Sequence, residues 1–113
     1  MIDLDSTFNA LADPTRRGIL AQLCLGEATA LELARPFAMS QPAVSRHLMV
    51  LEKAGLIVTR IEGSKRPRSL APNALQELDK WLELLRTGLE RNYDRLDRLL
   101  EAQQRNSTIV GEN

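Results

Sequence analysis

Three side chains with strong hydrogen-bonding groups lie close together in the chain: an amide at Gln41, a hydroxyl at Ser45 and a guanidinium at Arg46. Proteins use these groups to hydrogen-bond with base edges in the major groove of DNA. A solvated helix surface would carry similar residues, so the three alone leave both interpretations open. The choice depends on the elements that position these side chains.

The element that carries them is predicted to be a short helix between Ser40 and Gly55. Ser40 is suited to cap the first turn, Pro42 to occupy it, and Gly55 to end the helix in a left-handed conformation. Apolar residues at helical spacing provide one edge for burial, namely Val44, Leu48 and Leu51. The amide, the hydroxyl and the guanidinium then point away from the core.

Another short helix is predicted before this one, because residues 31–34 have helical spacing and Pro36 limits how far they can continue. Residues 37–39 would form the connection. Two helices joined by a turn of about three or four residues, the second polar on its outer face, form a helix-turn-helix. Further upstream, residues 4–12 predict an amphipathic segment, and residues 13–26 predict a helix capped by its first residue.

A β-hairpin is predicted after the helix that ends at Gly55. Residues 56–61 are rich in β-branched side chains, and residues 68–71 can return as the partner strand. Pro67 cannot donate a ladder hydrogen bond and should lie at the edge of the loop. The tip of this hairpin is predicted to carry three cations: Lys65, Arg66 and Arg68.

The charge of the chain is balanced overall but uneven along its length. The formal net charge is zero, which argues against indiscriminate binding to nucleic acid. Residues 46–68 nevertheless carry six basic and two acidic side chains, and the segments on either side are each net acidic. Such a local basic zone is typical of a phosphate contact, although a solvated surface is the common fate of a charge cluster.

The last third of the chain predicts one long helix that needs a partner. Leu75, Leu82, Leu89 and Leu96 recur every seven residues, and a second row lies three residues further on, at Leu78, Leu85, Asn92 and Leu99. The simplest partner is a second copy. Asn92 could pair with its counterpart or face solvent. The predicted dimer interface combines this seam with the first helix: Leu4, Phe8, Leu78, Leu82, Leu85, Leu89, Asn92, Leu96 and Leu99.

Length and composition predict one mainly α-helical domain with a small β-hairpin over residues 1–104, followed by a flexible polar tail at 105–113. No apolar run is long enough for a membrane span and no secretory signal is visible, so we expect a cytoplasmic protein. Cys24, the one cysteine, shares a helix face with Leu20 and is expected to be a small buried hydrophobe.

The order of these parts resembles the ArsR/SmtB family of bacterial winged-helix transcriptional regulators. The resemblance covers about Phe8 to Leu100 and rests on four stretches: ALADPTRR at 10–17, QPAVSRHL at 41–48, LEKAGLI at 51–57 and the basic hairpin. It implies a homodimer, held by the first and last helices, that represses its own operon by placing two recognition helices on double-stranded DNA at a palindromic operator. The DNA-binding residues are then expected to be Ser40, Gln41, Pro42, Ser45, Arg46, His47, Lys65, Arg66 and Arg68.

The chain departs from this family in the residues that would sense a metal. It lacks the paired cysteines and the histidines that metal-responsive members carry, so we expect no metal site and no cofactor. The sequence identifies no inducer and leaves open whether one exists. His47 is open to two interpretations, a DNA contact or a packed residue at the core edge. A protein-interaction module is the alternative function, and no constellation of an enzyme is visible.

Overall fold

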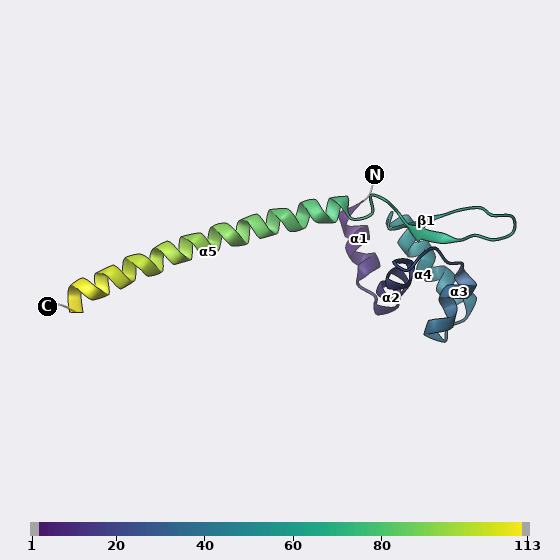
Figure 1. Ribbon diagram of the computed structural model, residues 1–113, viewed down its shortest axis with the longest axis horizontal. Coiled ribbons are helices and arrows are strands. Elements are labelled where there is room, and N and C mark those ends of the chain that lie inside the picture. Colours follow the sequence, from purple (N-terminus) through teal and green to yellow (C-terminus); the bar gives the residue numbers. More distant parts are fainter. Residues whose placement is uncertain (1–2, 112–113) are drawn as a thin grey trace. The chain divides into compact units, whose positions relative to one another are not determined.

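The computed structural model describes residues 3–111 of the 113, with side chains described from residue 3 to residue 105. Its elements, in chain order, are α1 (Leu4–Leu11), α2 (Pro14–Leu23), α3 (Ala30–Ala34), η1 (Arg35–Phe37), α4 (Gln41–Lys53), β1 (Ile57–Thr59), β2 (Arg68–Leu70) and α5 (Gln76–Gly111), as Figure 1 shows. The fold is mainly helical with one antiparallel two-stranded hairpin, which confirms the predicted class. None of the described helices combines the length and apolarity that a membrane span requires.

Side-chain caps fix where the short helices begin. Asp13 accepts a hydrogen bond from the Arg16 amide at 3.0 Å, and Pro14 is the first residue of α2. Ser40 accepts one from the Ala43 amide at 3.3 Å at the start of α4. Gly55 has a φ of 77°, so it ends α4 in the left-handed conformation predicted for it. Local sequence therefore determines most helix ends in this part of the chain.

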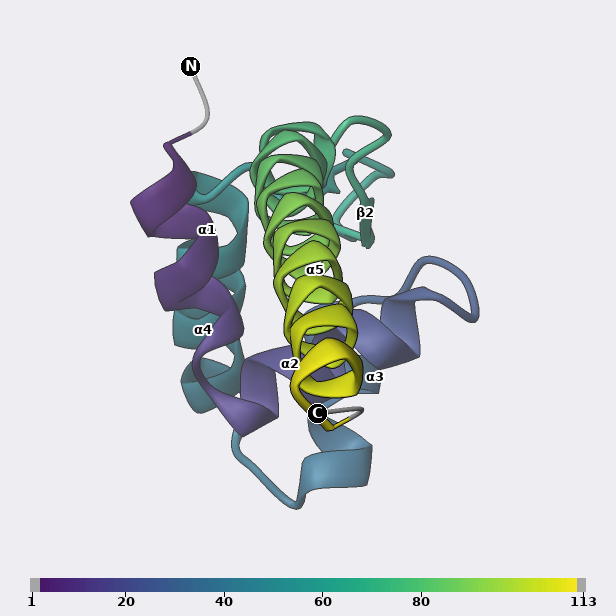
Figure 2. The ribbon, with the colours of Figure 1, turned by 90° about the vertical axis from the view of Figure 1, so that its left-hand side faces the viewer.

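The chain divides into two compact units at Leu78. In the first unit, α1 lies alongside α4, and α2 and α3 also pack against α4 (Figure 2). Its core is contributed by every helix up to α4 and by β1, with nearly complete burial of Ile19, Leu33, Val44, Leu48, Leu51, Leu56 and Ile57. The predicted apolar edge of α4 is thus the middle of this core.

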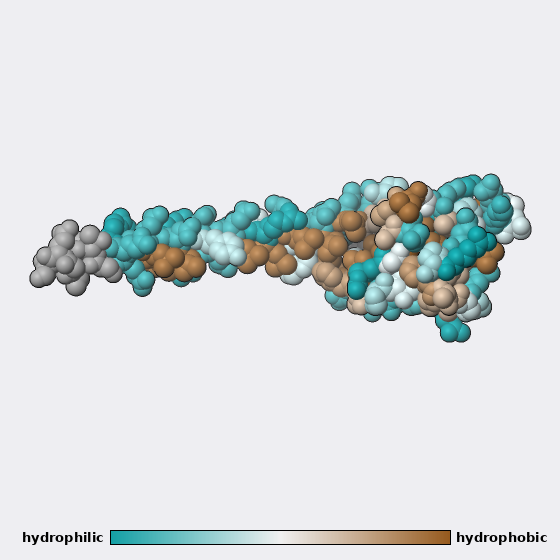
Figure 3. Space-filling view, turned by 60° about the horizontal axis from the view of Figure 1, so that its bottom comes forward, coloured by the Kyte–Doolittle hydropathy of each residue, from teal (hydrophilic) through white to brown (hydrophobic). Residues whose placement is uncertain are grey.

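The second unit, from Asp79 onward, is a single helical stretch whose apolar side chains gather in one row (Figure 3). Among the side chains described in this unit, the exposed large apolar ones are Trp81, Leu82, Leu84, Leu85, Leu89, Tyr93, Leu96, Leu99 and Leu100. The long helix is as predicted, except that Leu75 lies in the turn before its first residue, Gln76. The expected flexible tail at 105–113 falls almost wholly outside the described side chains and stays a prediction.

Two expectations about single residues are wrong. Cys24 is exposed rather than buried, because the face that it shares with Leu20 borders an open apolar hollow of about 470 Å³ while Ile19 and Leu23 face the core. Arg68 lies on β2, paired with Thr59, and not at the tip of the hairpin. The hollow beside Cys24 is lined by residues from distant parts of the chain, whereas Arg68 is the first residue of the return strand and therefore lies away from the tip.

Candidate nucleic-acid interface

Helix α4 presents its polar residues on the side opposite the core. Gln41 and Arg46 are exposed and Ser45 is half-buried, whereas Val44 and Leu48 are at most 1% exposed. Ser40 uses its hydroxyl to cap the helix, and Pro42 is exposed in the first turn. The face with base-reading chemistry is therefore accessible, and its backbone is held by the buried edge of the same helix.

The segment before α4 forms the other half of the helix-turn-helix. Helix α3 packs against α4, and Pro36 lies in the 3-10 turn η1 that follows α3 directly. Ala38 then adopts a left-handed backbone with a φ of 51°, which redirects the chain into α4. Between α2 and η1, Gly18 faces the ring of Phe37 so closely that an added Cβ would lie 2.7 Å from Phe37 Cε1.

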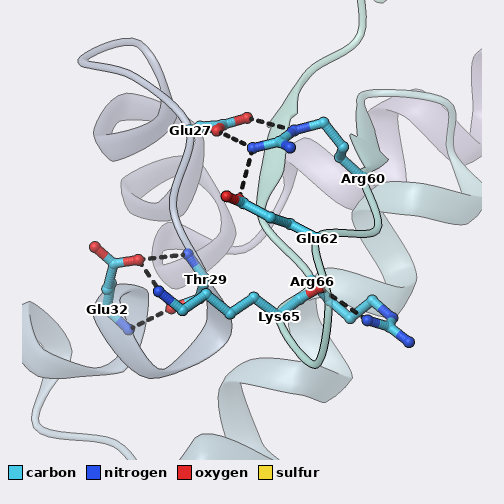
Figure 4. Close-up of polar contacts among 7 residues, drawn as sticks. All are labelled: Glu27, Thr29, Glu32, Arg60, Glu62, Lys65 and Arg66. Carbon is cyan, nitrogen blue, oxygen red and sulfur yellow. Dashed lines mark hydrogen bonds and ion pairs between the residues drawn. The ribbon is translucent and has the colours of Figure 1, made fainter.

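The hairpin is fastened to the loop between α2 and α3, which the sequence did not indicate. Ala28 and Arg68 exchange two backbone hydrogen bonds, of 3.0 and 2.8 Å. Arg60 adds a polar contact to the same loop by donating to both carboxylate oxygens of Glu27, and it also bonds Glu62 at 3.0 Å (Figure 4). These carboxylates raise the pKa of Arg60, chiefly through the hydrogen bonds that Arg60 donates to Glu27.

The cations of the hairpin differ in their exposure and in their hydrogen bonds. Lys65 and Arg66 are exposed, although Arg66 Nη1 donates to the backbone oxygens of Gly63 and Lys65 at 2.9 and 2.8 Å. Arg68 is half-buried, and its Nε has no hydrogen-bond partner among the described residues. Because Arg60 is engaged by two carboxylates, the basic zone is smaller than the sequence count suggested.

One open hollow brings the predicted residues of α4 and the hairpin together. It has a volume of about 690 Å³ and is lined by Gln41, Ser45, Lys65, Arg66 and Arg68 together with residues of α3 and its flanks. Arg46 and His47 are not among its lining residues. Thr29, Glu32 and Arg35 line the same hollow, although no motif in the sequence marked them as site residues.

His47 lies beside α2 as well as on α4. Its Nδ1 is 3.4 Å from Arg16 Nη1, so a hydrogen bond there requires the imidazole tautomer that carries its proton on Nε2. The Arg16 guanidinium is itself held by the backbone oxygens of Ala10 and Asn9, both at 2.8 Å. This arrangement gives His47 a packing partner and leaves Nε2 for any further contact.

Two carboxyl groups at helix starts are biased toward their charged forms. The backbone amide of Arg16 holds the pKa of Asp13 below its ordinary value. The pKa of Glu32 is lowered chiefly by the backbone amide of Thr29 and then by its hydroxyl, with smaller effects of Arg35 and Lys65. Among the described residues, no group of three or more His, Cys, Asp or Glu side chains could hold a metal ion.

A capped helix-turn-helix with a basic hairpin attached defines a winged-helix DNA-binding protein. Residues 13–59 match the model of the bacterial regulatory protein, arsR family. The chain is 42% identical to the HTH-type transcriptional regulator Rv2034 of Mycobacterium tuberculosis, over 80% of this chain and 78% of that protein. It therefore belongs to the arsR family of bacterial regulatory proteins, which are transcriptional regulators and not enzymes.

A second relative and a solved structure are also similar to this chain. The transcriptional repressor SdpR of Bacillus subtilis is 37% identical, over 70% of this chain and 88% of the repressor. A solved structure from Mycobacterium bovis, described as a homodimeric winged helix-turn-helix DNA-binding domain, superposes with a TM-score of 0.61 at 25% identity, over 74% of this chain and 78% of that one.

Proposed function

We propose that this protein is a homodimeric repressor that binds a palindromic operator and thereby covers a promoter. The observation that carries the proposal is the hollow that joins the exposed start of α4 to the basic hairpin. In this arrangement α4 enters the major groove with Gln41, Ser45 and Arg46, while Lys65 and Arg66 contact phosphates. Ser40, Pro42, His47 and Arg68 complete the proposed interface, and such a regulator would act in the cytoplasm.

The proposed dimer rests on the apolar row of α5. Large side chains of this row are strongly exposed, including Leu89 at 53% and Leu96 at 51%. A solvent-exposed helix that carries a seven-residue leucine repeat is stabilised when a second helix covers the repeat. The Mycobacterium bovis structure, described as homodimeric, supports the same assembly here. Leu4 and Phe8 of α1 are proposed to contribute to the interface as well.

We further propose that metals do not control this regulator. The proposal is supported by the lack of a cluster of ligands among the described residues and by the positions of Cys24, which follows α2, and His47, which lies on α4. Operator affinity should therefore be unchanged when zinc, cadmium or arsenite is added, or when a chelator is present. A gel-shift titration with each metal checks this. A stoichiometric loss of affinity that a chelator reverses would contradict the expectation.

The function itself is tested by selecting duplexes from a random-sequence pool with the full chain and comparing them with the promoter upstream of its own operon. The proposal expects an inverted repeat whose half-sites lie about one helical turn, or a multiple of it, apart. Recovery of no sequence preference at any salt concentration would contradict it. That outcome, together with a protein captured through the apolar row of α5, would favour the protein-interaction module instead.

A further inference from the structure

The hollow between α3, α4 and the hairpin contains one acidic side chain among several cations. Among its described lining residues, Glu32 is the only acid, and the cations are Arg35, Lys65, Arg66 and Arg68. Glu32 belongs to α3 rather than to the groove-facing helix. A carboxylate at this position faces the space in which the proposed function places the phosphates of DNA.

The Glu32 carboxylate is held in place by a capping box. Its Oε1 accepts hydrogen bonds from the Thr29 backbone amide at 3.1 Å and from the Thr29 hydroxyl at 3.0 Å (Figure 4). The Glu32 amide donates in return to Thr29 Oγ1 at 3.3 Å. These contacts lower the pKa of Glu32, so the side chain is charged at neutral pH. The capping box thus favours the charged carboxylate and holds it at the hollow.

Lys65 is the cation of the hairpin that this charge affects. Its side chain extends from the hairpin toward Thr29 and Glu32 (Figure 4), and its charge contributes to the low pKa of Glu32. The Arg66 guanidinium, in contrast, folds back onto the backbone oxygens of Gly63 and Lys65. Before DNA binds, Glu32 therefore already places a negative charge on the side toward which Lys65 extends.

We propose that Glu32 attenuates DNA binding by competing with a backbone phosphate for Lys65. The inference rests on the proposed function, because it needs DNA in the hollow. Phosphate contacts carry no sequence information, so this competition lowers the affinity for every duplex. Binding to DNA outside the operator is weakened as well. Glu32 is thus a residue of the DNA-facing surface that acts against binding.

The test substitutes Glu32→Gln and measures affinity for a mixed-sequence duplex and for the selected operator. Glutamine can make both hydrogen bonds of a capping box, so α3 should keep its start. Affinity for both duplexes should rise by about two- to fivefold per subunit, the size expected for one exposed ion pair. Glu90→Gln on α5 is the matched control, since it changes the net charge equally outside the hollow.

A double-mutant cycle with Lys65→Ala tests whether the effect of Glu32→Gln on DNA affinity depends on Lys65. In the Lys65→Ala background, the gain from Glu32→Gln should largely disappear. The proposal is overturned if Glu32→Gln leaves affinity unchanged or lowers it in a protein with the wild-type thermal midpoint, or if the gain persists undiminished without Lys65.

Another measurement avoids any change at Glu32. If Glu32 partly neutralises the charge of Lys65, Lys65→Ala should reduce the slope of log affinity against log salt by less than Arg66→Ala does. An equal or larger reduction would overturn the proposal. A wild-type protein that binds no selected duplex would instead contradict the proposed function, whereas operator binding without any effect of Glu32 would contradict this inference alone.

Discussion

At the scale of single residues, the interface depends on side chains that hydrogen-bond to the backbone at the starts of helices. Thr29 with Glu32 caps α3 and Ser40 caps α4, the two helices of the helix-turn-helix, and Asp13 caps α2 before them. Each cap satisfies amide groups that would otherwise lack a partner. The position of the groove-facing residues therefore depends on a few short hydrogen bonds at helix starts.

The cap at Asp13 makes stability depend on pH. Its folded-state pKa lies below the unfolded value of about 3.9, so its stabilisation is present above that value and is lost as the pH falls through the folded pKa. Asp13→Asn keeps a capping side chain that does not titrate in this range.

The difference in the free energy of unfolding between wild type and Asp13→Asn should therefore favour wild type most near neutral pH and shrink on acidification. Urea titrations at a series of pH values measure it, with Asp94→Asn on α5 as a control for the lost charge. A difference that does not change with pH would show that the charged form of Asp13 has no special role.

At the scale of elements, the packing of α2 on η1 requires a residue without a side chain. An added Cβ at Gly18 would lie 2.7 Å from Phe37 Cε1 and 3.0 Å from Cζ. Alanine is the better helix former by about 1 kcal/mol, but overpacking a core typically costs about 1 to 3 kcal/mol. The cost of overpacking should exceed the gain in helix propensity here, because Phe37 packs against the core cluster.

Gly18→Ala should therefore lower the free energy of unfolding by about 1 kcal/mol, as measured by chemical denaturation. Gly88→Ala is the matched control, because nothing lies within 4 Å of its added Cβ, and it should stabilise or leave stability unchanged. Adding Phe37→Leu to Gly18→Ala should recover part of the loss. Stabilisation by Gly18→Ala alone would show that Phe37 moves aside without cost.

Most elements could be predicted from the sequence, because their signals are local. The cap at Ser40, the proline at the start of α4 and the glycine after it all act within a few residues of themselves. What the sequence could not reveal depends on contacts between distant segments. The contact of Arg60 with Glu27 joins residues 33 apart in the chain, and Glu32 reaches the hollow through the packing of α3 on α4. Cys24 is exposed because it borders an open hollow whose other lining residues come mostly from distant segments.

At the scale of the whole molecule, the proposed binding to an inverted repeat requires two copies of the chain. A single α4 reads one half-site, and a two-fold symmetric dimer presents two copies of it to an inverted repeat. The leucine row of α5 is the proposed source of that dimer. Burying one leucine stabilises by about 1.5 to 3 kcal/mol, and a charge in its place adds a desolvation cost.

Leu89→Glu should therefore convert the protein to a monomer with weakened operator binding, and Leu96→Glu should do the same. Arg91→Glu, which introduces the same residue outside the row, is the control and should remain dimeric. Light scattering at micromolar concentration distinguishes the two states. A Leu89→Glu protein that stays dimeric would show that the row is not the interface.

A salt titration of wild type, Arg46→Ala and Arg66→Ala on operator and scrambled duplexes shows whether α4 reads sequence while the hairpin contacts phosphates. Arg46→Ala should cost about 1 to 3 kcal/mol per half-site on the operator and reduce the preference for it. Arg66→Ala should weaken both duplexes alike and reduce the salt slope by about one unit per subunit. Full sequence preference in Arg46→Ala, together with its loss in Arg66→Ala, would contradict this division of roles between α4 and the hairpin.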